Sequence, residues 1–566
     1  MDARDFQELV TRHVTERYAL DPVAATVAGI HDHDHRMPDM TGPGFGDRDA
    51  FVDRWLTELE GIPQQGLGPV ERTDRALLLA DLRGQQAVRE FARWRRDPGL
   101  YSNAVIRGAY YLLIRDGSSP GAQTEAAGRG RAPGPEGGVP PTEGRSEDRL
   151  RRLVQRLEHA GDVLAAGREN IDPDRTPPVW VVVAGEQAAA GATFVRALLP
   201  SLAPDGSPLK HDLLAVGKRA GDALDAYAAW LRDDVMRRAR GTWSVGRDTF
   251  EALLRERDLT DHTRDTLQKF GQDLYRETVG RIDAATRELG DSDWRESVAR
   301  IRKDHPAEQE LVATYRGEME RSREATRRAE LATFPEREEL VVEAMPDFAR
   351  PTAPYALYVG AGAFEAHRRG RFWVTLPPAT DPANVKEERL EGHPRAGIPV
   401  IACHEGYPGH HLQLSRAADH PSIARKAVRS NLFVEGWGLY IEELMTELGY
   451  LGSPETRLLR LKDVLWRAAR VLVDIGLATG SMSFEQAVSF MVDGPKLERP
   501  NAIAEVRRYT YDPLQPSSYA LGRAAILVLR DRAKRRGFGM KQFHDTLLAA
   551  GSLPPKLLAA EVGLPD

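Results

Sequence analysis

The chain has 566 residues, with 78 Lys and Arg against 84 Asp and Glu, which gives a formal net charge of -6 at pH 7. This mildly acidic balance, without a lysine-rich tail, argues against nucleic acid as the main partner. The single cysteine, Cys403, excludes a disulfide framework and a cysteine-based zinc site. The N-terminal stretch is polar and no run of about 18 apolar residues follows it, so we expect a cytoplasmic protein without a membrane partner.

Amphipathic helices are expected along most of the chain, because apolar residues recur three and four positions apart among abundant Arg and Glu. This pattern predicts helices over residues 148–167, 249–289, 308–331, 458–475 and 518–535. Two short runs, 179–183 and 372–376, have the β-branched and aromatic composition of strands. The expected fold is therefore mainly α, with at most a small β-sheet.

One segment differs in composition from the rest. Residues 117–144 contain 13 Gly or Pro among 28 residues and almost no large apolar side chain. Such a segment cannot bury enough surface to offset the entropy of ordering, so we expect a mobile loop. Because no internal repeat and no other linker is apparent, residues 1–566 are expected to form a single helical unit.

The stretch 397–413, GIPVIACHEGYPGHHLQ, carries the residues most typical of a metal site. It is similar to the HExxH zinc motif, in which residues four apart on one helix present two imidazoles to one metal. Here, however, proline occupies position 408. On a continuous helix, His404 and His411 would lie about 10 Å apart along the axis, and His404 and His410 would point about 120° apart. Neither pair could then bind one zinc ion at about 2.1 Å.

Pro408 and Gly409 are expected to interrupt this helix. The proline ring clashes with the carbonyl four residues back, and glycine permits unusual backbone dihedrals. A bulge at this point could place the following histidine where a residue four positions after His404 would lie. Geometry alone leaves open whether that histidine is His410 or His411.

A carboxylate inside a second predicted helix, 431–445, is the candidate third ligand. Glu435 lies among apolar residues, where burial of a charge is costly unless the charge is paired or bound to a metal. Gly436 and Gly438 flank Trp437, and each glycine costs about 1 kcal/mol relative to alanine within a helix. Such glycines usually mark the close approach of another element. A His/His/Glu set leaves a fourth zinc position open for water.

Together, HEGYPGHHLQ and FVEGWGLYIEEL resemble the signatures HExxPGHH and EGW(A/G)LY of the bacterial family called domain of unknown function 885. The resemblance extends to residues 21–39 and to SYALGRAAILVLR at 518–530. More remotely, the chain is similar to the helical zinc peptidases of the thermostable carboxypeptidase Taq and thimet oligopeptidase types. Their Gly-His pair corresponds to Gly409 and His410, and their later glutamate corresponds to Glu435.

The resemblance implies a large helical metallopeptidase-like fold with a deep cleft and one Zn2+ per chain, although another divalent metal is possible. The metal core would comprise residues 397–450 together with a C-terminal helix at 518–535. The implied metal ligands are His404, His410 and Glu435, with His411 as the alternative second ligand.

Catalytic roles follow from zinc chemistry and from the resemblance. Glu405, next to a ligand, is expected to be the general base. The related peptidases supply a tyrosine that stabilises the oxyanion, and Tyr519 is the candidate here, with Tyr509 and Tyr511 as competitors. Arg523 lies one helical turn beyond Tyr519 and could hold a substrate carboxylate through two hydrogen bonds.

The expected function is a zinc-dependent hydrolase that cleaves an amide bond in a small peptide or peptide-like metabolite by metal-activated water. The alternatives are a zinc-dependent lyase or deacylase of a small metabolite, or a non-catalytic, metal-containing binding protein. The run HDHDH at 31–35 is more typical of a solvated loop than of a second metal site. Cys403 is expected to be a small core residue beside the site.

Overall fold

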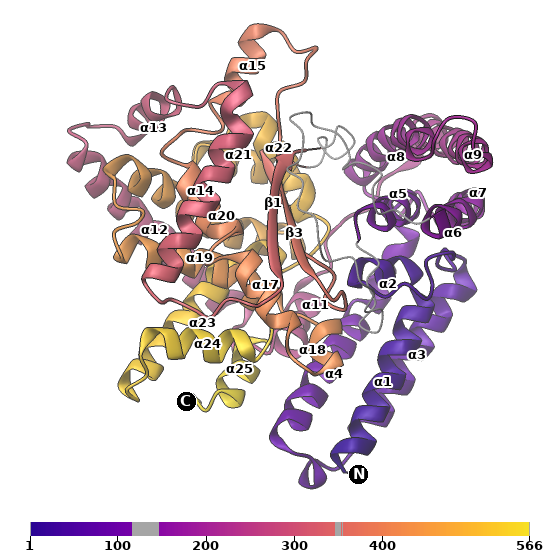
Figure 1. Cartoon of the computed structure of the whole chain (residues 1–566), viewed down its shortest axis with the longest axis horizontal. Helices are drawn as coiled ribbons and strands as arrows, with labels where there is room; N and C mark the ends of the chain where they lie inside the picture. The colour runs from indigo at the N-terminus through magenta and orange to yellow at the C-terminus, as the bar shows by residue number, and fades with distance from the viewer. Residues whose placement is uncertain (1, 116–146, 346–352, 354, 565–566) are drawn as a thin grey trace.

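The computed structural model describes residues 2–115, 147–345, 353 and 355–564 (Figure 1). In these residues the chain is mainly helical with one small β-sheet, which confirms the predicted fold class. The loop expected at 117–144 lies outside the described residues.

The first part of the chain contains α1 (Ala3–Leu20), α2 (Pro22–Ala28), α3 (Gly42–Glu60), α4 (Pro69–Ala87), α5 (Gly99–Ile114), α6 (Glu147–Glu158), α7 (Ala160–Asn170), α8 (Pro178–Leu198) and α9 (Pro208–Trp230). Next come α10 (Met236–Arg238), α11 (Arg247–Ala252), α12 (Arg264–Glu288), α13 (Trp294–Arg302) and α14 (Leu311–Arg328). After the sheet follow α15 (Ala383–Leu390), α16 (Ile398–Glu405), α17 (His410–Ala418), α18 (Ile423–Ala427), α19 (Asn431–Glu447), α20 (Pro454–Ala478), α21 (Phe484–Asp493), α22 (Arg499–Tyr509), α23 (Gln515–Arg535), α24 (Met540–Ala549) and α25 (Pro555–Glu561).

The sheet has three strands, β1 (Glu338–Ala344), β2 (Ala356–Val359) and β3 (Arg368–Val374), in the order β1-β3-β2. The central strand β3 pairs in parallel with β1 and antiparallel with β2. The strand expected at 372–376 overlaps β3. Buried residues of β3 pack with α14 and α16, so the sheet supports the helix that carries the HE motif.

The strand expected at 179–183 is wrong, because these residues lie in α8. Their β-branched composition favours a strand, but α8 buries Trp180, Val181, Ala184 and Ala188 at helical spacing. This face packs against α5 and α9. Tertiary packing therefore overrides the local propensity.

Two expected helices are interrupted. Residues 148–167 form α6 and α7, which are separated by His159. Residues 249–289 form α11, a π-helical turn at Leu253–Arg257, and α12, which begins at a capping box on Thr263. Composition and periodicity identify the helical regions here but not the breaks within them.

The largest hydrophobic core joins the two ends of the chain, from Phe6 to Leu564. In it, residues of α1, α3 and α4 pack with residues of α17–α19 and α23–α25. Figure 1 shows the C-terminal helices beside α17–α19, with α5–α9 grouped at the upper right, above the N-terminal helices α1 and α3. The HE motif is therefore built into the core that holds the termini together.

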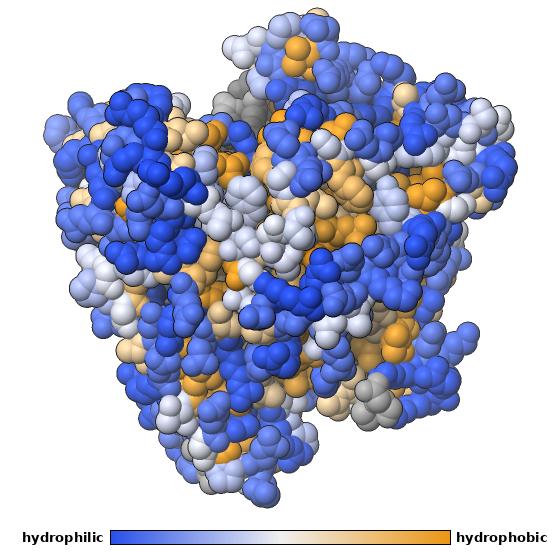
Figure 2. Space-filling view, turned by 180° about the vertical axis from the view of Figure 1, so that it is seen from behind, coloured by the Kyte–Doolittle hydropathy of each residue, from blue (hydrophilic) through white to orange (hydrophobic). Residues whose placement is uncertain are grey.

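One helical stretch among the described residues, Pro178–Leu202, is long and apolar enough to cross a membrane by length and composition. Of its most apolar window, 44% is buried inside the protein. This helix packs against α5 and α9. The face of the molecule seen in Figure 2 is hydrophilic around its rim, and hydrophobic residues gather toward its centre.

Candidate metal centre

The HE motif helix ends where the sequence predicts an interruption. Helix α16 stops at Glu405, the Tyr407–Pro408 peptide bond is cis, and α17 starts at His410. A Cβ atom at Gly409 would lie 1.9 Å from the carbonyl oxygen of His404, so a residue with a side chain does not fit there. The break turns the chain so that the two helices meet end to end.

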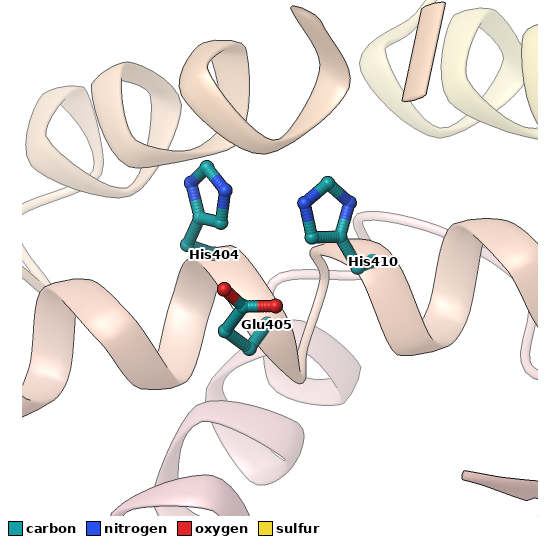
Figure 3. A group of neighbouring side chains, drawn as sticks. All are labelled: His404, Glu405 and His410. Atoms are coloured by element: carbon teal, nitrogen blue, oxygen red, sulfur yellow. The ribbon is translucent and has the colours of Figure 1, made fainter. Parts of the chain in front are cut away.

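This turn brings His404 and His410 together (Figure 3). Their ring centroids lie 4.7 Å apart with the ring planes at 89°. One ligand atom from each of His404, Glu405 and His410 lies within 4.8 Å of the others. In Figure 3 both imidazoles project to the same side of the chain, and the Glu405 carboxylate lies next to them.

The orientation of His404 is fixed by α19. Its Nδ1 atom lies 2.7 Å from Oε1 of Glu442, and both side chains are buried. This contact leaves Nε2 of His404 available for a metal, in the carboxylate–histidine arrangement that commonly orients zinc ligands. Gly438, also on α19, lies directly against the ring, where a Cβ atom would be 2.7 Å from Cε1.

Glu435 of α19 lies next to the pair, with Oε2 3.4 Å from Nε2 of His410. Two ligands of a tetrahedral zinc ion at about 2.1 Å are separated by roughly 3.4 Å, so this spacing suits a shared metal. Burial acts to raise the pKa of Glu435, but the hydrogen bond and charge of His410 outweigh it and lower the pKa to about 2. For His410, burial acts to lower the pKa, but Glu435 and Glu405 raise it.

The adjacent His411 has a different environment. Its Nδ1 lies 3.1 Å from the Tyr358 hydroxyl and its Nε2 lies 2.8 Å from Oε2 of Glu338. The Tyr407 hydroxyl donates to the same Glu338 oxygen at 2.5 Å. Both ring nitrogens of His411 are therefore engaged by β1 and β2, and the structure brings His410 rather than His411 next to His404.

The carboxylate of Glu338 anchors this network. Burial acts to raise its pKa, but the hydrogen bonds from His411 and Tyr407 and the charge of Arg323 lower it to about 2. An Arg323 nitrogen lies 2.6 Å from Oε1 of Glu338. The network ties the Tyr407–Pro408 turn to the sheet and so holds His410 in place.

Tyr519 lies beside the histidines, whereas its competitors are engaged elsewhere. The Tyr519 ring stacks at 6.5 Å from His404, and its hydroxyl forms no hydrogen bond within the described part of the chain. The Tyr509 hydroxyl accepts from Arg470 at 2.7 Å, and Tyr511 stacks on Trp180 at 4.9 Å. Burial and the charge of Glu435 raise the pKa of Tyr519, which keeps the phenol protonated.

Arg523 does not present a free guanidinium. Its Nε donates to Oε2 of Glu443 at 2.6 Å, and the two side chains are only 11% and 17% exposed. Glu442, which contacts His404, and Glu443, which contacts Arg523, were not predicted from the sequence. The signal for Glu442 was its position seven residues after Glu435, which places the two carboxylates on one face of the helix.

The HDHDH run is solvated only in part, because Asp32 and His35 are exposed whereas Asp34 is not. Asp34 is buried and accepts hydrogen bonds from Thr26 at 2.6 Å and from His31 at 2.8 Å. The fully buried Arg156 of α6 donates to the Thr26 hydroxyl at 2.8 Å and lies 3.8 Å from Asp34. The run therefore joins α2 to α6. Cys403 is buried as expected, and burial raises the pKa of its thiol.

The residues at the site fit a zinc ion. The imidazoles of His404 and His410 converge with the carboxylate of Glu405, Glu442 orients His404, and Glu435 lies from His410 at the spacing of two zinc ligands. Nδ1 of His410 is buried without a hydrogen-bond partner among the described residues. Glu405 makes no hydrogen bond or ion pair to the described residues, so its carboxylate is free to act on a bound molecule.

Comparison with known proteins extends over nearly the whole chain. The family described as "Bacterial protein of unknown function (DUF885)" matches residues 22–562. A crystal structure from Colwellia psychrerythraea, described as a "putative lipoprotein", is 18% identical, with a TM-score of 0.78 over 99% of this chain and 98% of the other. A "putative lipoprotein of unknown function" from Shewanella oneidensis is 22% identical, with a TM-score of 0.76 over 98% of each chain. Among curated proteins, none matches.

Proposed function

The chain belongs to the bacterial family of unknown function DUF885, and we propose that it is a zinc-dependent hydrolase that cleaves an amide bond in a small peptide or peptide-like metabolite. The observation that carries this proposal is the free carboxylate of Glu405 beside two converging histidines. A purely structural metal site needs no such carboxylate, because its ligands alone complete the shell.

His404, His410 and Glu435 would hold the metal, and Glu442 would keep Nε2 of His404 directed toward it. A zinc ion in this position supplies Lewis-acid polarisation of the substrate carbonyl and lowers the pKa of bound water toward about 7. The remaining chemistry belongs to the side chains of the protein.

Glu405 would take the proton from the attacking water at a carboxylate oxygen and then deliver it to the leaving nitrogen. One of its carboxylate oxygens lies within 4.8 Å of a ring nitrogen of each histidine, beside the position that the metal would take. The Tyr519 hydroxyl would donate a hydrogen bond to the carbonyl oxygen as negative charge develops there. Its protonated state is favoured by burial and by Glu435.

Two measurements test the proposal together. Elemental mass spectrometry of the purified protein is expected to find about one zinc per chain in the wild type and none in a His404→Ala, Glu435→Ala double variant. Incubation with a library of short peptides is expected to release new amino groups. Glu405→Gln should keep the metal but lower the rate about 10²- to 10⁴-fold, since general-base catalysis contributes about that much.

The outcomes separate the possible functions. Wild-type protein that holds one zinc per chain but releases no amine from peptides or acylated amines would refute the hydrolase. A Glu405→Gln variant that cleaves as fast as the wild type would refute the role of Glu405. If Glu405→Gln loses zinc and Glu435→Gln retains it, Glu405 is the metal ligand and Glu435 is the candidate base.

A further inference from the structure

A group of cationic side chains lies next to Tyr519, and we call it the arginine cluster. Its cations are Lys462, Arg467 and Arg470 of α20 and Arg508 of α22, and its anions are Asp463 and Glu505. Four cations face these two anions, and Glu435 of the metal centre is a further carboxylate that interacts with Arg508, so positive charge is still in excess. An anion of a ligand would balance this excess next to Arg470, whose side chain is only 4% exposed.

The cluster is connected to the metal centre by short contacts. The Tyr519 ring stacks on His404, and the Arg470 guanidinium carbon lies 4.7 Å from the centre of the Tyr519 ring. Arg470 lies 3.1 Å from Glu505, which in turn accepts from Arg508 at 2.8 Å. Arg508 is close enough to Glu435 and Tyr519 for its charge to act on both. An anion at Arg508 would therefore lie near a bond held at the metal.

Two features show that the arginine cluster can form further hydrogen bonds with a ligand. The Arg470 side chain is 4% exposed, yet its Nη1 atom has no hydrogen-bond partner within the described ranges. A buried donor without a partner costs roughly 1–3 kcal/mol. The Arg508 side chain is 43% exposed, so it is the part of the cluster that a ligand can reach.

We propose that the arginine cluster binds a carboxylate of the substrate, with Arg508 and the unpaired Nη1 of Arg470 as donors and with Glu505 holding the two guanidinium groups together. This inference rests on the proposed function, since the carboxylate belongs to the molecule whose amide bond is cleaved. A guanidinium binds a carboxylate through two parallel hydrogen bonds, which gives both affinity and orientation. Arg523, the residue that the sequence suggested for this task, is 11% exposed and paired with Glu443. Arg508 bonds Glu505 at 2.8 Å and Gln515 at 3.1 Å, but its side chain is 43% exposed and can exchange the neutral Gln515 for a carboxylate.

The carboxylate has two possible sources, the C-terminus of a peptide or an acidic side chain, and binding experiments distinguish them. The zinc-free protein is used first, so that zinc does not bind the carboxylate itself. Calorimetry compares N-acetyl-Ala-Ala-Ala with its C-terminal amide, and the amides of N-acetyl-Ala-Glu-Ala and N-acetyl-Ala-Gln-Ala. In one of the two pairs, the peptide with the carboxylate is expected to bind about tenfold or more tightly than its neutral counterpart. The pair that shows this difference identifies the source of the carboxylate.

Variants assign the preference to the cluster. Arg508→Met should abolish it, and Arg508→Lys should restore part of it. Arg470→Met should weaken binding of the carboxylate peptide but not of its neutral counterpart, whereas general unfolding would weaken both. The matched control is Arg499→Met, because Arg499 lies on the same helix in an exposed pair with Glu485 and should leave the preference unchanged.

The outcomes keep this inference separate from the proposed function. A preference for carboxylates that survives in Arg508→Met, or equal binding of both members of each peptide pair, would overturn the role of the cluster. Cleavage of peptides without such a preference would keep the hydrolase and reject the cluster. A preference that depends on Arg508 in a zinc-loaded protein without any amide cleavage would support the cluster and reject the hydrolase.

Discussion

Gly438 offers a direct test of the metal centre, because this glycine leaves room for the imidazole of His404. A Cβ atom at position 438 would lie 2.7 Å from Cε1, 2.9 Å from Nε2 and 3.1 Å from Nδ1 of His404. Ordinary contacts of this kind are 3.4 Å or longer, so in Gly438→Ala the ring must move by about 0.7 Å, the difference between 3.4 and 2.7 Å. We therefore expect Gly438→Ala to displace the His404 ring while the protein remains folded.

The expected magnitude follows from the contacts of His404. Its Nδ1 atom is held by Glu442 at 2.7 Å, so a displaced ring loses either this hydrogen bond or its direction toward the metal. Loss of such an orienting contact typically lowers metal affinity about 10- to 100-fold. Alanine, in contrast, favours the helical state by about 1 kcal/mol relative to glycine. Metal affinity should thus fall, while the gain in helix propensity offsets part of the strain in the metal-free protein.

The assay is a zinc titration in competition with a chelator, together with urea unfolding of the metal-free protein. Gly280→Ala is the matched control, because Gly280 lies within α12 and a Cβ atom there would meet nothing within 4 Å. This control should gain stability without a change in zinc affinity. A folded Gly438→Ala protein that binds zinc as tightly as the wild type would refute the assignment of His404 as a ligand.

Three further outcomes are expected. His410→Ala should reduce zinc to well below one per chain, whereas His411→Ala should keep the metal. The His411→Ala variant should lose about 1–3 kcal/mol of stability, because it leaves Tyr358 and Glu338 without a hydrogen-bond partner. Equal zinc loss in both variants would contradict the assignment of His410 as the ligand. Arg156→Met should lower the free energy of unfolding by roughly 3–5 kcal/mol in a urea titration, because Asp34 would remain buried without this cation. The double variant Arg156→Met, Asp34→Asn should recover part of this loss. The pKa of Glu338 is lowered to about 2 from an ordinary 4.5, so its contribution to stability is present above pH 4.5 and lost as the pH falls toward 2. Glu338→Gln should therefore make the free energy of unfolding less dependent on pH across this range. An unchanged pH dependence would contradict the network.

The interruption of the motif helix was predictable because it depends on local chemistry. A proline four residues after His404 and a glycine beside it make a regular helix unfavourable, whatever the rest of the chain does. The helical character of most of the chain follows in the same way from residues three and four positions apart. These predictions depend on covalent geometry and periodicity, which a single sequence contains.

The choice between His410 and His411 could not be made from spacing, because it depends on residues far away in the sequence. Tyr358 and Glu338, which engage His411, lie 53 and 73 positions before it. The pairing of Arg523 with Glu443 likewise joins residues 80 positions apart. Such partners become apparent only when the sheet and the helices are packed, and they decide which side chains remain free for function.

Two glycines of α19 act on opposite sides of the helix. A Cβ atom at Gly436 would lie 2.4 Å from the backbone of Gly522, so this glycine allows α23, which carries Tyr519, to pack closely. Gly438 is two residues further along, about 200° around the helix, and faces His404 instead. The sequence indicated close approach at both positions, and the structure identifies a different neighbour for each.

Glu435, Gly438 and Glu442 are spaced by three and four residues and therefore share one face of α19. Glu435 contacts His410, Gly438 makes room for His404, and Glu442 orients His404. The same helix also holds the interrupted turn, because Nε1 of Trp437 donates to the carbonyl oxygen of Pro408 at 2.8 Å. A single rigid element thus sets the positions of both histidines relative to each other. Neither the segment 404–411 nor the segment 435–442 alone therefore fixes the relative position of the two histidines on which the proposed metal site depends.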